Sequence, residues 1–232
     1  MAIDKKFMRG VRSGLPIALG YFPIAIAFGA LAIQANLTWI EATLMSVIVF
    51  AGASQFVGVS MLLTGAGAMQ IITTTFFLNM RHLIMSLTIN DQMRHFPQSW
   101  KNLLSFGITD ESFALLTLGK AGKDQDQELT PYYVGGLMLT AYLGWISGTA
   151  VGGLGASFIS AEITTAMTIG LYGLFIGLLI PPIRKSLSYG VIAVVSMFLN
   201  YLLGFIVDSG WAIVLATILA AGLGMIFIKE PA

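Results

Sequence analysis

The sequence of 232 residues contains no cysteine and only two histidines, His82 and His95. The lack of cysteine excludes disulfides, thiolate metal sites and cysteine nucleophiles, and two imidazoles are too few for a convincing metal site. Charged residues are scarce too, at 10% of the chain against about a quarter in soluble proteins. The formal net charge of +1 gives no basis for nucleic-acid binding.

Motifs of common enzyme classes are also missing. The sequence has no G-x-x-x-x-G-K-[ST] loop, no H-E-x-x-H pair and no G-x-S-x-G elbow, which argues against ATP hydrolysis through a P-loop and against an intramembrane hydrolase. We therefore expect neither enzyme activity nor a cofactor. Energy for any transport would come from a gradient or from another subunit.

Apolar residues are abundant, at 56% of the chain with a mean hydropathy of +0.85. Repeated apolar runs of about 18–25 residues, without the alternation of β-barrel strands, indicate membrane-spanning helices. We expect an all-α, polytopic membrane protein with a single membrane domain over 1–232. The sequence predicts about eight transmembrane helices, over 15–33, 41–63, 69–89, 103–118, 132–154, 165–180, 187–207 and 211–228.

A hydrophilic linker over 120–131 divides the chain into a first half, 1–119, that carries the polar motifs and a second half, 132–232. Both halves contain spans interrupted by glycine or proline, which favours an internal repeat of the transporter kind. The halves do not align convincingly. The repeat is therefore an expectation from composition alone.

Basic residues set the expected orientation. Lys5, Lys6, Arg9 and Arg12 precede the first span, which we interpret as a retained helix, and they place the N-terminus in the cytoplasm. Eight crossings put both chain ends inside, but they turn the basic segment 91–101 outward, against the charge rule. A re-entrant 103–118 would return that segment to the inside, so seven crossings is the alternative.

Polar residues interrupt the third span at Asn79, Arg81 and His82. A charged side chain at bilayer depth costs about 2.5–3.5 kcal/mol, so it usually faces a partner, a cavity or a substrate. On an unbroken helix Asn79 and His82 share a face, whereas Arg81 points about 200° away from Asn79. Snorkelling of Arg81 and simple packing of His82 are the structural alternatives.

The fourth predicted span, 103–118, is short and carries Asp110 and Glu111 in its middle. It is compatible with a tilted helix, a broken helix or a re-entrant hairpin. Its two acids are candidate partners of Arg81 or candidate proton carriers.

Two further motifs stand at positions where a substrate or another helix can approach. Pro23 leaves a carbonyl of the first span without its helical donor, which permits either a substrate contact or a plain kink. The second span contains FAGASQFVG, whose small residues Ser54 and Gly58 form one face with Gln55 beside it. Helix packing explains this face equally well. A glycine ridge in the fifth span indicates helix packing.

The motifs GLPIALGYFPIAIAFGALA, MSVIVFAGASQF, FFLNMRH and TDESFAL, in this order and spacing, resemble the AzlC-type large subunit of the branched-chain amino-acid exporter family. The resemblance implies a bacterial inner-membrane protein that exports leucine, isoleucine, valine and related analogues. It also implies an AzlD-type small membrane subunit as partner. The motif positions carried over are Pro23, Gly52, Ser54, Gln55, Asn79, Arg81, His82, Asp110 and Glu111.

These motifs lead to a hypothesis for the site. Arg81, or helix N-termini exposed at breaks, holds the substrate carboxylate, and Asp110 or Glu111 meets its ammonium or carries the coupling proton. The surface over 54–58 admits the aliphatic tail. A membrane scaffold whose glycine faces only bind partner helices, and an uptake carrier or channel for another small solute, are the alternatives, and a higher oligomer is left open.

Overall fold

The computed structural model describes residues 2–118, 129–160 and 186–227 apart from 208, with individual residues between 161 and 185. In these parts of the chain every regular element is a helix, which confirms the all-α prediction. Most of the linker predicted over 120–131 and most of the span predicted over 165–180 lie outside the described residues.

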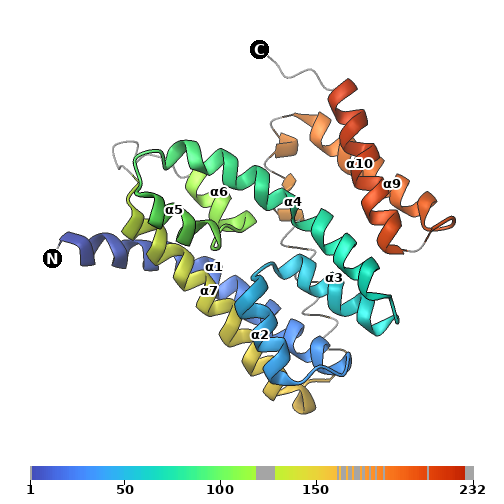
Figure 1. The fold of residues 1–232 in the computed structure, drawn as a ribbon, viewed down its shortest axis with the longest axis horizontal. Coiled ribbons are helices and arrows are strands. Elements are labelled where there is room, and N and C mark those ends of the chain that lie inside the picture. Colours follow the sequence, from blue (N-terminus) through green and yellow to red (C-terminus); the bar gives the residue numbers. More distant parts are fainter. Residues whose placement is uncertain are drawn as a thin grey trace.

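Two long helices, α1 (Ala2–Gln34) and α7 (Pro131–Leu154), form the centre of the fold. Both are long and apolar enough to cross a membrane, and they run side by side in the same direction (Figure 1). A Cβ atom at Gly148 would lie 2.6 Å from the Phe22 carbonyl oxygen, so only glycine permits this approach. The packing interpretation of the α7 glycine ridge is confirmed.

The sequence predicts one continuous span over 41–63, and this prediction is wrong. The segment forms two helices, α2 (Trp39–Val49) and α3 (Gly52–Leu63), because the backbone enters the left-handed region at Phe50, with φ of 42°. Gln55 Nε2 donates to Ser46 Oγ across the break, at 3.0 Å. This bond brings α3 back beside α2, so the two helices form a hairpin.

This first hairpin begins at the far end of the α1–α7 pair. A Cβ at Gly153, near the end of α7, would lie 3.0 Å from the Trp39 Cβ. An 11-residue helix is about 16 Å long, roughly half of a bilayer core of about 30 Å. The hairpin is therefore deep enough to reach the middle of the membrane and return.

Helix α4 (Ala68–Gln92) follows α3 after a short turn and runs back along it. Thr75 of α4 lies beside Gly58 of α3, where an added Cβ would be 3.6 Å from its Cγ2 atom. At 25 residues α4 is about 37 Å long and can cross the bilayer. Its end returns to the level of the N-terminus. The His95 ring, beyond that end, bonds to the Leu129 carbonyl just before α7, at 2.9 Å.

The segment predicted as a short span over 103–118 is broken. Helix α5 (Gln98–Ser105) and helix α6 (Asp110–Leu118) are separated by the turn 106–109. Trp100 of α5 packs on Tyr132 at the start of α7, and Leu116 of α6 joins the hydrophobic cluster of Phe96 and Val134 at that same end. Of the alternatives left open, the structure thus shows a second hairpin, entering from the opposite end to the first.

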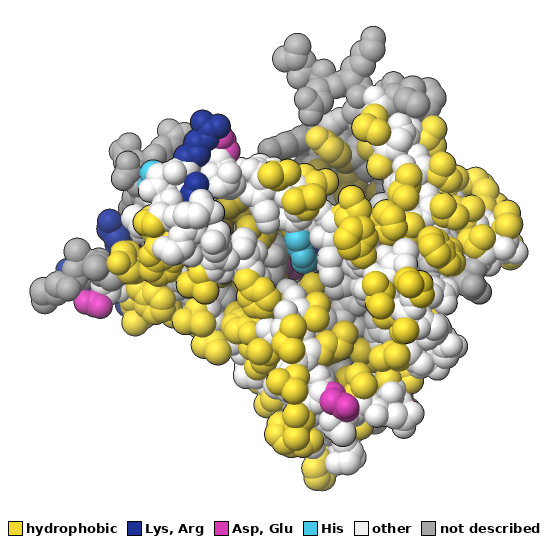
Figure 2. Space-filling model, in the orientation of Figure 1, with side chains coloured by type: hydrophobic (Ala, Val, Ile, Leu, Met, Phe, Trp, Pro, Cys, Tyr) yellow, Lys and Arg dark blue, Asp and Glu magenta, His cyan; other side chains and the backbone are white. Residues whose placement is uncertain are grey.

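Helices α9 (Leu187–Leu203) and α10 (Ser209–Phe227) form an antiparallel pair that packs on α4 at the edge of the molecule (Figure 1). The unit of one long helix followed by a hairpin occurs twice, as α1 with α2–α3 and as α4 with α5–α6, in opposite directions. Figure 2 shows that apolar side chains cover much of the outer face, as expected for contact with lipid.

Candidate functional site

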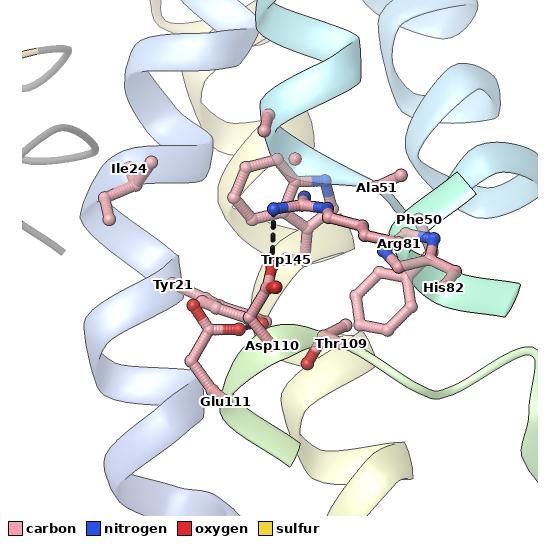
Figure 3. A pocket seen from close by; sticks show the side chains of 12 residues that line it. Tyr21, Ile24, Phe50, Ala51, Arg81, His82, Thr109, Asp110, Glu111 and Trp145 are labelled. Atoms are coloured by element: carbon pink, nitrogen blue, oxygen red, sulfur yellow. Dashed lines mark hydrogen bonds and ion pairs between the residues drawn. The ribbon is translucent and has the colours of Figure 1, made fainter. Parts of the chain in front are cut away.

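The first hairpin turns at residues 50–51 and the second at residues 106–109. These two turns, called the tips below, meet in the middle of the fold. The Phe50 and Phe106 rings lie 6.3 Å apart, and both contact Tyr142 of α7, at 4.9 and 5.7 Å. A pocket lies beside this contact (Figure 3). It is lined by Tyr21, Ile24, Phe50, Ala51, Gly52, Ala53, Arg81, His82, Thr109, Asp110, Glu111 and Trp145.

An ion pair crosses the pocket. Arg81 Nη1 of α4 lies 2.8 Å from Asp110 Oδ2, and the two side chains are 33% and 24% exposed. The contact forms because the turn 106–109 starts α6 at the depth of Arg81. Asp110 is therefore the partner for Arg81 that the sequence offered as one alternative.

The second acid of the α6 tip has a different partner. The Tyr21 hydroxyl of α1 donates a hydrogen bond to Glu111 Oε2, and Tyr21 is buried, at 7% exposure. Ser112 Oγ accepts from the Thr109 backbone N–H at 2.8 Å and fixes the first turn of α6. Two adjacent carboxyl groups are thus presented to different helices, Asp110 to α4 and Glu111 to α1 (Figure 3).

The tip of the first hairpin contributes backbone rather than charge. Helix α3 begins at Gly52, its N-cap residue Ala51 makes no side-chain cap bond to the first turn, and both residues line the pocket, so the positive end of the helix dipole favours an anion there. A Cβ at Gly52 would lie 2.7 Å from Trp145 Cη2. Glycine is needed here because the indole ring packs directly on the backbone.

A buried polar network holds this first tip on α7. Gln55 Oε1 accepts from Trp145 Nε1 and from the Ala51 backbone N–H, at 3.0 and 3.2 Å. Gln55 Nε2 bonds Ser46 Oγ, which contacts Thr149 Oγ1 at 2.8 Å. Both arms of the first hairpin are thereby anchored to α7.

The structure brings together five of the nine predicted site residues, namely Gly52, Arg81, His82, Asp110 and Glu111. Ser54 and Gln55 are buried behind the tip, where the Ser54 hydroxyl donates to the Ala51 carbonyl. Pro23 lies on the exposed side of an unbroken α1, and Asn79 lies outside the pocket lining. Helix α4 is continuous at this level, which explains why Arg81 and Asn79 do not share a site.

Several pocket residues were missed by the motif analysis, above all Tyr21, Phe50 and Trp145. The phenol of Tyr21 lies in the middle of an apolar span and is itself a polar group that needs a partner at bilayer depth. This signal was available from the sequence. Trp145 lies within the glycine ridge and had no comparable signal, because its place in the pocket depends on how the first hairpin folds.

The pocket is small and partly open to the surface, since the Arg81 and Asp110 side chains that line it are 33% and 24% exposed. Its cavity measures about 30 Å³, enough for about two water molecules at 10–15 Å³ each. A hollow containing a histidine lies at the centre of the face shown in Figure 2. The cavity in this conformation is smaller than an amino acid.

The lining combines a guanidinium, two carboxyl groups, a helix N-terminus and apolar rings. This set is complementary to a small molecule that carries one positive and one negative charge beside an apolar group. In the described parts of the chain, no group of three or more acidic or histidine side chains could hold a metal ion.

Comparisons with known proteins place the chain in a family. The family model described as AzlC protein matches residues 16–159. An uncharacterized membrane protein of Archaeoglobus fulgidus is 32% identical over 84% of this chain and 86% of its own length. The inner membrane protein YgaZ of Escherichia coli is 28% identical, over 81% of this chain and 77% of that protein.

The branched-chain amino acid transport protein AzlC of Bacillus subtilis is also 28% identical, over 74% of this chain and 66% of its own. No solved structure matches the chain. The family match covers both hairpins and all the pocket residues, and it confirms the resemblance seen in the sequence motifs. The chain is a membrane protein and belongs to the AzlC family.

Proposed function

We propose that this chain is the large subunit of a gradient-driven transporter that exports branched-chain amino acids. Family membership and the name of the Bacillus subtilis relative support the substrate class. The direction of transport and the AzlD-type small subunit rest on the motif resemblance. The observation that carries the proposal is the Arg81–Asp110 ion pair inside the pocket.

An ion pair of this kind matches the head group of an amino acid. When a zwitterion enters, its carboxylate meets the Arg81 guanidinium and its ammonium meets the Asp110 carboxylate. Each charged side chain then exchanges one charged partner for another, so no charge is left uncompensated at bilayer depth. The N-terminus of α3, at Gly52, adds a second attraction for the carboxylate.

The apolar wall of the pocket suits the aliphatic tail. Ile24, Phe50 and Trp145 contribute apolar side chains to the pocket lining. Burying a leucine or isoleucine side chain against such a wall contributes about 1.5–3 kcal/mol. The site thus favours aliphatic amino acids over glycine or over amino acids with polar tails.

The two hairpins supply a means of alternating access. Their tips meet at the pocket from opposite ends of the molecule, and Phe50 and Phe106 close the contact. Parting one tip at a time would open the pocket to one side of the membrane and then to the other. The network around Gln55 holds the first tip on α7, so we propose that the second hairpin makes the larger movement.

We further propose an inner-membrane location with the N-terminus in the cytoplasm. The Arg9 guanidinium packs over the Tyr133 ring at the start of α7, and the His95–Leu129 bond brings the basic segment 91–101 to the same end. Basic residues of both segments then lie on one side. This arrangement satisfies the charge rule that eight crossings would violate.

The small subunit is proposed to cover part of the apolar surface. The outer face of α4 exposes large apolar side chains next to the pocket-forming part of that helix, namely Ile72, Phe76, Leu83 and Leu87. A small hydrophobic subunit packed there would support the helix that carries Arg81.

Counterflow of labelled leucine in proteoliposomes tests the proposal. The chain is reconstituted with and without the product of an adjacent gene for a small membrane protein. Arg81→Gln tests the pocket, and Arg94→Gln is the matched control, because Arg94 also pairs with an acid, Asp91, but is 80% exposed. We expect counterflow in the wild type and in Arg94→Gln, and its loss in Arg81→Gln. A folded complex without leucine counterflow would contradict the proposal.

A further inference from the structure

The two carboxyl groups at the α6 tip differ in what a proton would do to them. Asp110 is ion-paired with Arg81, so a proton there leaves the guanidinium without that counter-charge. No lysine or arginine nitrogen of the described residues lies within ion-pairing distance of Glu111. Its hydrogen-bond partner is the neutral hydroxyl of Tyr21.

A tyrosine hydroxyl is suited to a group that gains and loses a proton. It donates to a carboxylate, and after a small rotation it accepts from a carboxylic acid. Glu111 can therefore keep its Tyr21 partner in both protonation states. Asp110 has no such freedom, because its pairing with Arg81 requires the ionised form.

The surroundings make Glu111 decisive for the charge of the pocket. Among the residues that the structure describes, the ionisable groups that line the pocket with it are Tyr21 on α1, Arg81 and His82 on α4, and Asp110 beside it on α6. The positive charge of Arg81 and the negative charge of Asp110 cancel, and a zwitterionic substrate adds no net charge. With neutral His82, the net charge among these groups then follows the protonation state of Glu111.

We infer that Glu111, positioned by Tyr21, carries the proton whose entry drives amino-acid export; this rests on the proposed function. The carboxylate takes a proton from water on the proton-rich side and becomes a carboxylic acid. After the tips exchange access, the acid returns the proton to water on the other side. No bond to the substrate forms or breaks, and the substrate leaves in the opposite direction.

The test separates exchange from proton-driven flux in the same proteoliposomes. Leucine exchange at equal pH needs no net proton movement, whereas leucine flux driven by a pH gradient does. Glu111→Gln can neither take up nor release a proton. We expect it to keep leucine exchange within about tenfold of the wild type and to lose the flux driven by the pH gradient, while Asp110→Asn loses both.

Tyr21→Phe tests the positioning role. It removes the donor to the Glu111 carboxylate, and one hydrogen bond of about 1–1.5 kcal/mol corresponds to about one pH unit. We expect the pH of half-maximal proton-driven flux to move by about that amount toward alkaline pH. Tyr201→Phe, on the exposed face of α9, is the matched control and leaves the profile unchanged.

The outcomes are distinguishable. Wild-type leucine exchange without any response to a pH gradient, or a Glu111→Gln variant that still responds to it, overturns the inference. Absence of leucine exchange in the wild type overturns the proposed function itself, and the inference with it. If Glu111→Gln fails to assemble, Glu111→Asp decides, because an altered pH profile supports the inference and an unaltered one overturns it.

Discussion

At the scale of single residues, the Arg81–Asp110 pair is costly to bury and therefore informative. Removing two charges from water is only partly repaid by their attraction, so such pairs are a weak source of stability. The pair nonetheless lies in a pocket at the meeting point of two hairpins. The proposed role in holding a zwitterionic substrate would account for charge at this place.

Neutralising the pair separates structure from function. Arg81→Gln leaves Asp110 without the cation at 2.8 Å, so we expect a lower melting temperature than for the double variant Arg81→Gln with Asp110→Asn. Loss of one charged hydrogen bond, about 1.5–3 kcal/mol, should slow leucine exchange about 10- to 100-fold in both. Melting curves in detergent and exchange assays measure the two effects. A double variant with wild-type exchange would remove the pair from the site.

Two glycines of α3, Gly52 and Gly58, should differ in how well they tolerate alanine. Gly52→Ala places a Cβ 2.7 Å from the Trp145 ring, whereas at Gly58 the nearest atom, Thr75 Cγ2, is at 3.6 Å, an ordinary contact distance. We expect Gly52→Ala to lower leucine exchange at least about tenfold by displacing the tip or the indole, and Gly58→Ala to be tolerated. Equal exchange in the two variants would show that the fit of the tip against Trp145 does not matter.

At the scale of elements, the reversals of the chain in the two hairpins could not be predicted from the hydropathy of the sequence. The run 41–63 is long and apolar enough for one crossing, and nothing in its hydropathy marks Phe50 as the break. The turn depends on the bond from Gln55 to Ser46 and on the indole of Trp145 in a distant helix. Hydropathy reports the length of an apolar run but not whether the run reverses direction.

Charge was more informative than hydropathy. Buried ionisable groups need partners, and that requirement made Asp110 and Glu111 candidate partners of Arg81, with a role as proton carriers as the alternative. The structure pairs Asp110 with Arg81. The same reasoning applies to Tyr21. It does not apply to Trp145 or Ile24, because apolar residues that line a pocket look the same in sequence as those that face lipid.

Cross-linking the tips tests whether they must part. The chain has no cysteine, so Phe50→Cys with Phe106→Cys supplies one thiol at each tip, where the native rings lie 6.3 Å apart. Joining them by oxidation or with a short bifunctional reagent should abolish leucine exchange, and cleaving the link should restore it. The single cysteine variants are the controls. Full exchange in the cross-linked protein would refute alternating movement of the tips.

At the scale of the whole molecule, the fold predicts which loops share a side of the membrane. The loop between α3 and α4 lies at the far end from the N-terminus, and the segment after α4 lies at the same end as the N-terminus. Eight simple crossings assign both segments to the opposite sides. Two re-entrant hairpins therefore predict a different topology from the same hydropathy profile.

Thiol labelling in intact cells distinguishes the two topologies. Thr64→Cys, in the exposed α3–α4 loop, should react with a membrane-impermeant reagent added from outside. Arg94→Cys, after α4, should react only once the membrane is opened. The reverse pattern would favour eight crossings.

The central claim is that the pocket between the hairpin tips takes an aliphatic zwitterion. Competition against labelled leucine counterflow tests it most directly, with isoleucine and valine compared with leucine analogues that lack either the carboxylate or the ammonium. We expect competition by isoleucine and valine, and at least about tenfold weaker competition by analogues that lack either charge, since each of these analogues loses a charged contact. Equal competition by the singly charged analogues would contradict it.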